Sequence, residues 1–359
     1  MASEVPLVPV FDGHNDTLVA LHLPGDEEPR SFFERSDRGH IDLPRALKGG
    51  FRGGLFAVFV PDKEWGHDLL GGELKFGPEG YDLPLPPPLE PQYAKDTTHH
   101  VIADLFHLES EAGGQLRVVR TGQELRESVE SDVVAAVLHF EGAEAIDESL
   151  DNLSTWYDAG LRSVGIVWSR PNAFASGVPF RFPGSPDTGS GLTDAGRALV
   201  RRCNEMGILL DLAHLNERGF WDVASLTDAP LAVSHTAAHV LCASTRNLTD
   251  RQLDAVGESD GIVGVMFHVG SLRVDGQSIA DTPLSEITRH VDYIARRIGV
   301  DHVGFGSDFD GALVPLELGD VAGLPRLIEA LRAGGFDEQD VRKIAYQNWL
   351  RVLEQTWKG

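Results

Sequence analysis

The chain has 359 residues, of which 42% are hydrophobic and 24% charged, an ordinary composition for a globular protein that buries a sizeable core. The formal net charge of −24 argues against nucleic acid as a partner, because phosphates would be repelled. Two cysteines without a CxxC pair indicate neither a disulfide framework nor a thiolate metal site.

Eight apolar runs bounded by turn residues predict strands. The runs are continuously apolar rather than alternating, which is typical of parallel strands covered on both faces. In chain order they are residues 8–16, 53–60, 133–142, 161–170, 207–214, 231–235, 261–267 and 302–311.

Helical segments fall between these runs. Thr121 and Thr249 each open a capping box, and Asp337 opens the last helix. Thr193 is a predicted N-cap whose helix ends at Gly207. Alternating strands and helices predict a (β/α)8 TIM-type barrel in one domain, residues 1–359. A doubly wound open sheet is the alternative, but no GxGxxG or Walker loop supports it.

Two segments are longer than a bare barrel requires. Residues 61–91, rich in glycine and proline, follow the second strand, and residues 171–192 follow the fourth. Loops after barrel strands lie on the catalytic face, so we expect these insertions either to shape a pocket or to decorate the surface.

No apolar run approaches the ~18 residues that a membrane span needs. The N-terminus has no basic segment followed by an apolar stretch, and the motif at His14 comes too early to leave room for a signal peptide. We therefore expect a cytoplasmic protein without a membrane partner.

Polar side chains end five of the predicted strands. Barrel enzymes keep their chemistry at the carboxyl ends of the strands, so we expect these residues to meet at one mouth. In chain order they are His14 and Asp16, Glu141, His214, His235 and Asp308.

Imidazole and carboxylate ligands without thiolate select zinc or a similar first-row divalent ion. Three histidines and two carboxylates exceed what one open catalytic zinc takes, so we expect two zinc ions roughly 3.5–4 Å apart. Glu141 is the expected bridge, with His14 and Asp16 on one ion and His214 and His235 on the other. His139 and His239 rank lower as ligands.

Several stretches of the chain together resemble the renal (membrane) dipeptidase family of zinc peptidases, within the amidohydrolase-like barrels. These stretches are "DGHND" (12–16), "FEG" (140–142), "NEMGILLDLAH" (204–214), "APLAVSHTAAHVLCASTRNLTD" (229–250), "VGFGSDFDG" (303–311) and "QNWLRVLE" (347–354). The resemblance implies the same five ligands for two zinc ions. It also implies that Arg246 grips the carboxylate of a dipeptide, that Asp308 is the acid/base, and that the protein is a homodimer.

Two departures from the family pattern concern the substrate. Trp168 stands where the family carries a histidine that polarises the scissile carbonyl, and Ser169, Arg170 or Asn172 are candidates to replace that histidine. The family's "EGGH" is "EGAE" at 141–144. We therefore predict a metal-dependent dipeptidase in which Trp168 contacts the substrate. The alternatives are a related barrel hydrolase of another small amide, lactam or ester, and a catalytically silent metal-binding protein.

Overall fold

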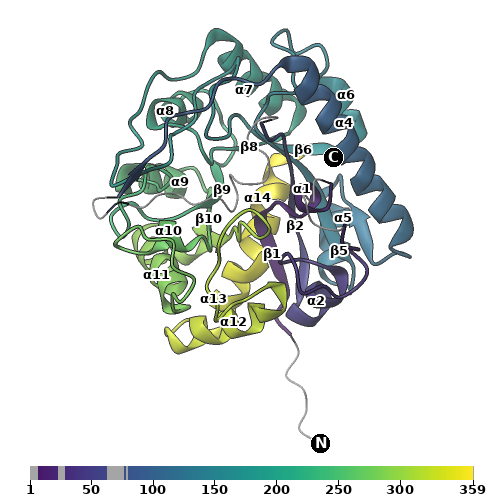
Figure 1. The fold of residues 1–359 in the computed structure, drawn as a ribbon, viewed down its shortest axis with the longest axis vertical. Helices are drawn as coiled ribbons and strands as arrows, with labels where there is room; N and C mark the ends of the chain where they lie inside the picture. The colour runs from purple at the N-terminus through teal and green to yellow at the C-terminus, as the bar shows by residue number, and fades with distance from the viewer. Residues whose placement is uncertain (1–6, 23–28, 63–76, 78–79, 359) are drawn as a thin grey trace, which may run out of the picture.

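The computed structural model describes residues 7–22, 29–62, 77 and 80–358, and a closed barrel of parallel strands forms its centre (Figure 1). Eight strands follow one another around the barrel, and β11 pairs with β1 to complete it. The predicted (β/α)8 barrel is confirmed, and closure excludes the open sheet. In barrel order the strands are β1 (Val10–Asn15), β2 (Phe51–Phe59), β5 (Val134–Glu141), β6 (Leu161–Gly165), β8 (Leu209–Asp211), β9 (Ala232–Thr236), β10 (Ile262–Val265) and β11 (Val303–Phe305).

Helices form a ring outside the strands (Figure 1). The predicted caps are present: the Thr193 hydroxyl accepts a hydrogen bond from Gly196 N at 3.0 Å, and Gly207 ends that helix with a φ of 71°. The helices are α1 (Thr17–His22), α2 (Leu43–Gly49), α4 (Pro91–Glu111), α5 (Gly122–Val129), α6 (Leu153–Ala159), α7 (Asp194–Met206), α8 (Glu217–Ala224), α9 (Asp250–Glu258), α10 (Val269–Leu272), α11 (Ser285–Ile298), α12 (Leu324–Ala333), α13 (Glu338–Arg342) and α14 (Asn348–Thr356), with short 3-10 turns η1 (Val300–His302) and η2 (Val321–Gly323) and a π-helical turn η3 (Lys343–Gln347).

The last helix, α14, closes the amino-terminal end of the barrel. Trp349 is fully buried, and its indole Nε1 donates a hydrogen bond to Phe305 O at 2.8 Å. A Cβ at Gly13 or Gly264 would meet the Trp349 ring at 2.4 or 3.1 Å, so glycine at both positions makes room for the indole. With this end filled, only the carboxyl ends of the strands remain for a site.

The two predicted insertions meet above the carboxyl ends of the strands. Strands β3 (Tyr81–Asp82) and β7 (Arg181–Phe182) form a two-stranded antiparallel sheet that joins them, although residues 63–76 and 78–79 of the first insertion lie outside the described part. Thr245 N donates to Arg181 O at 3.1 Å, so the second insertion is also tied to the loop that follows β9.

One further strand, β4 (Leu116–Val118), pairs with the start of β5 outside the ring of eight. Within the described ranges, no helix combines the length and the apolar character that crossing a bilayer requires.

Candidate metal centre

Glu141 lies at the centre of a cluster of histidines at the carboxyl ends of the strands. Its Oε1 atom is 3.1 Å from the Nε2 atom of His214, 3.6 Å from that of His14 and 3.6 Å from that of His235. These histidines come from β1, from the loop after β8 and from β9, so barrel closure brings together residues far apart in the chain. Glu141 is the residue that the sequence predicts as the bridging carboxylate, and it lies within reach of all three predicted histidines.

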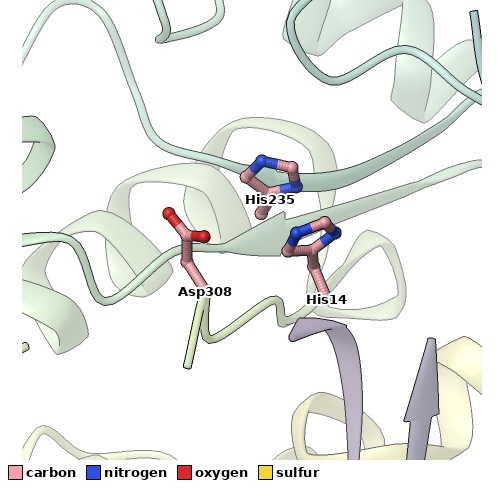
Figure 2. Close-up of side chains that lie close together, drawn as sticks. All are labelled: His14, His235 and Asp308. Atoms are coloured by element: carbon pink, nitrogen blue, oxygen red, sulfur yellow. The ribbon is translucent and has the colours of Figure 1, made fainter. Parts of the chain in front are cut away.

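All six strand-end residues predicted from the sequence reach this cluster. His14 Nε2 is 3.4 Å from Asp16 Oδ2, and Figure 2 shows Asp308 beside His14 and His235. Three groups of candidate ligand atoms have all their members within 4.8 Å of one another: His14, Asp16 and Glu141; Glu141, His214 and His235; and His14, His235 and Asp308.

Backbone hydrogen bonds between β1 and the loop after β11 fix the position of Asp308. Asp308 N donates to His14 O at 3.0 Å, and Asp16 N donates to Phe309 O at 2.8 Å. Asp308 and His214 both have left-handed backbones, with φ of 61° and 63°. This conformation is costly for residues other than glycine, and such strain clusters at functional sites.

The electrostatics of the cluster depend on burial and on mutual contact. Burial alone would lower the pKa of His14, but the carboxylates of Glu141 and Asp16 outweigh it and raise that pKa to about 10. Burial raises the pKa of Glu141 and lowers those of His214 and His235. A proton on His14 therefore balances the negative charge of the Glu141 and Asp16 carboxylates. A divalent cation bound here would take the place of that proton.

The donor set fits divalent cations. Among the described residues, both ring nitrogens of His14 and Oδ1 of Asp16 are buried without a hydrogen-bond partner. Buried polar atoms without partners cost roughly 1–3 kcal/mol each, a cost that metal ligation would remove. Neutral imidazoles with carboxylates are the ligands that zinc and similar ions prefer.

Arg246 lies next to the cluster in the loop after β9. Its side chain is buried, and Nη2 donates to His235 O at 3.3 Å. Burial lowers the pKa of Arg246, whereas the carboxylates of Asp308 and Glu141 raise it. A guanidinium with further donors therefore stands beside the candidate ligands, as binding of a carboxylate requires.

Trp168 belongs to a small aromatic wall beside the cluster. Its ring centroid is 4.9 Å from that of Phe59, 5.5 Å from that of Phe180 and 5.8 Å from that of His214. Arg170 is fully buried, with its Cζ atom 5.3 Å from the Trp168 ring centroid. The wall gives an apolar boundary to one side of the site.

The two other candidates for the missing histidine have different contacts. Ser169 Oγ lies 2.8 Å from Nδ1 of His214, where it orients a candidate ligand. Asn172 uses its amide on its own loop, donating to Ile166 O and accepting from Phe174 N and Ala175 N.

The lower-ranked histidines have other contacts, although the ring centroid of His139 lies 5.6 Å from that of His14 and its Nε2 lies 3.5 Å from Asp211 Oδ2. His139 is fully buried in β5, 2.9 Å from Ser163 Oγ through Nδ1. His239 contacts Gly184 O through Nε2 at 2.7 Å. Neither residue belongs to the three groups of candidate ligand atoms in the described part of the chain.

His268 is a residue at this mouth that the sequence reasoning missed. It lies three residues after the end of β10, its Nδ1 lies 2.9 Å from Ser271 Oγ, and burial together with the Arg246 charge lowers its pKa to about 4. A histidine directly after a predicted strand is the same signal that identified the other residues, so His268 could have been identified from the sequence.

Comparison with known proteins agrees with this geometry. The family model of the membrane dipeptidases (peptidase family M19) matches residues 5–358. A metallopeptidase from Rhodobacter sphaeroides, crystallised with a phosphinate mimic of the dipeptide L-Ala-D-Ala, is 48% identical, with a TM-score of 0.93 over 98% of this chain and 100% of that chain. The dipeptidase AC, a metallopeptidase of family M19, is 47% identical, with a TM-score of 0.92 over 99% and 100% of the two chains.

A curated relative from Klebsiella pneumoniae, named only as an uncharacterised protein in the pqqA 5′ region, is 47% identical over 257 residues, which is 72% of this chain and 95% of that protein. With the family model covering nearly the whole sequence, the chain belongs to the membrane dipeptidase family, peptidase family M19.

Proposed function

We propose that this protein hydrolyses dipeptides with two zinc ions bound at the shared Glu141 carboxylate. His14 and Asp16 would complete one site, and His214 and His235 the other. The observation that carries the proposal is the position of Glu141 Oε1 within 3.6 Å of three histidine nitrogens. The dipeptide mimic bound by the Rhodobacter sphaeroides protein, which is 48% identical to this chain, supports a dipeptide as the substrate.

When bound, such ions supply Lewis acidity and lower the pKa of a water molecule toward neutrality. Asp308 would accept a proton from the attacking water. Burial raises the pKa of Asp308 to about 6, so the carboxylate is mostly ionised at neutral pH and still basic enough to take a proton. As the new C–O bond forms and the C–N bond breaks, Asp308 passes this proton to the leaving amine.

Arg246 and Trp168 would orient the substrate. The Arg246 guanidinium would bind the C-terminal carboxylate, which places the scissile carbonyl over the cluster. The Trp168 indole offers an apolar face and one N–H donor, but it cannot become cationic as an imidazole can.

The tryptophan favours a second candidate function. Since this side chain replaces a polarising histidine, a related binuclear hydrolase of another small amide, lactam or ester is the runner-up. A panel of L,L- and L,D-dipeptides assayed beside N-acyl amino acids and lactams separates the two, because each candidate predicts turnover on its own substrate class. The ionisable Asp308 argues against a catalytically silent metal-binding protein.

The proposal is tested by metal analysis and dipeptide turnover of the wild type and of Glu141→Gln. We expect two zinc ions per wild-type chain, and loss of both bound metal and turnover in the variant. Glu144→Gln is the matched control, since this half-buried glutamate three residues away is outside the candidate ligand groups of the described residues and its variant should keep its metal. A Glu141→Gln protein with both ions and full turnover would refute the assignment.

A further inference from the structure

Two pairs of side chains inside the barrel share the same hydrogen-bond geometry. Asp12 accepts hydrogen bonds from the backbone N (2.6 Å) and the Oγ (2.7 Å) of Ser307. Asp211 accepts hydrogen bonds from the backbone N (2.7 Å) and the Oγ (2.6 Å) of Ser234. All four residues are buried, and each aspartate uses one carboxylate oxygen for the N–H and the other for the hydroxyl. We refer to these pairs as the Asp–Ser clamps.

The clamps lie at the two boundaries where the backbone pairing of neighbouring strands is shortest. Strands β1 and β11 share one register pair, Asp12 with Phe305, and strands β8 and β9 share one, Asp211 with Ala232. The other neighbours in the barrel share three to seven pairs. The clamps therefore supply side-chain connections where the backbone supplies few.

These two boundaries also carry every member of the metal centre except Glu141. The first clamp precedes His14 by two residues and adjoins Asp308 through Ser307, whose Oγ also lies 3.1 Å from His14 O. The second clamp precedes His214 by three residues and adjoins His235 through Ser234. A change of register at either boundary would move the candidate ligands apart, because side chains follow the backbone of their strands.

The second clamp continues into a candidate ligand. Ser234 has one hydroxyl proton, which it donates to Asp211 Oδ2, and its Oγ lies 2.7 Å from Nδ1 of His235. The hydroxyl must therefore accept from His235, which places the ring proton on Nδ1. Nε2 then carries its lone pair into the cluster, where His214 Nε2 lies 3.0 Å and Glu141 Oε1 3.6 Å away. A carboxylate behind a ligand histidine sets its tautomer and raises its basicity in this way.

We propose that Asp12 and Asp211 are positioning residues that hold the metal ligands and Asp308 in register, and that Asp211 also sets the tautomer of His235 through Ser234. The inference rests on the proposed ligation of zinc by His14, His214 and His235. Neither aspartate needs to touch the metal or the substrate.

The test compares zinc affinity, measured by competition with a chromophoric chelator, in the wild type, Ser234→Ala and Asp211→Asn. We expect one of the two ions to bind about 10- to 100-fold more weakly in both variants. Ser234→Thr keeps the hydroxyl and should recover most of the affinity. For the first clamp, Ser307→Ala should lower kcat by about 10- to 100-fold through displacement of Asp308 and leave KM unchanged, because Arg246 is untouched.

Asp42→Asn is the matched control. Asp42 is a buried aspartate that accepts from the N and Nε of Arg45 near α2, away from the metal centre, so its variant should lose thermal stability and keep zinc affinity and kcat. Loss of stability with wild-type zinc affinity in Ser234→Ala and Asp211→Asn would overturn the inference and leave the proposed function intact. A wild-type protein that takes up no zinc would overturn the ligation itself.

Discussion

Replacement of Arg246 by methionine tests the proposed contact with the substrate carboxylate. Methionine is unbranched and of similar reach, so it removes the charge with little loss of volume. Arg246 is buried, and Nη2 makes its protein contact with His235 O, so other donors of the guanidinium remain for a ligand. Removing one partner of a buried charge pair costs about 3–5 kcal/mol. This energy corresponds to a decrease of roughly 10²- to 5 × 10³-fold in kcat/KM.

The assay measures kcat/KM for a dipeptide and for its C-terminal amide, which lacks the carboxylate. The wild type should prefer the free acid by about the same 10²- to 5 × 10³-fold factor, and Arg246→Met should lose that preference while its low activity on the amide stays unchanged. Arg273→Met, which removes a partner of Asp275 outside the metal centre, is the control and should keep the wild-type ratio. Equal preference for the acid in Arg246→Met and in the wild type would refute the reasoning.

Three further predictions concern the acid/base residue and the fold. Asp308→Asn should lower kcat by about 10²- to 10⁴-fold with zinc content unchanged, and wild-type kcat should fall as the pH drops below about 6, where Asp308 takes up a proton; a pH–rate profile and metal analysis check both. Trp349→Ala should lower the free energy of unfolding by about 3–5 kcal/mol, because it empties the amino-terminal end of the barrel; urea denaturation measures this. Burial lowers the pKa of His290 to about 4, so the unfolded chain binds more protons than the native protein between pH 4 and 6.5, and stability decreases as the pH drops through that window. His290→Gln should therefore remove about 2 kcal/mol of the stability lost between pH 7 and 5 in urea titrations, and an unchanged pH dependence would contradict this assignment.

The position of each of the eight barrel strands and the residues at its end could be predicted from local patterns, whereas the short strands β3, β4 and β7 were not predicted. Apolar runs covered on both faces identify barrel strands without reference to their neighbours, and polar residues directly after those runs must lie at the carboxyl rim. Glu141 and His235 were therefore accessible from their own surroundings in the chain. His268 satisfies the same rule.

The register between strands depends on tertiary structure. Asp12 and Ser307 are 295 positions apart, and their contact depends on how β11 is staggered against β1, which no local pattern encodes. The pairing of the two insertions through β3 and β7 has the same cause. The residues at the strand ends can thus be predicted from the sequence, because an apolar run and the polar residue that follows it are properties of a short segment. The closure that brings three imidazoles onto one oxygen of Glu141 is decided by packing around the whole barrel.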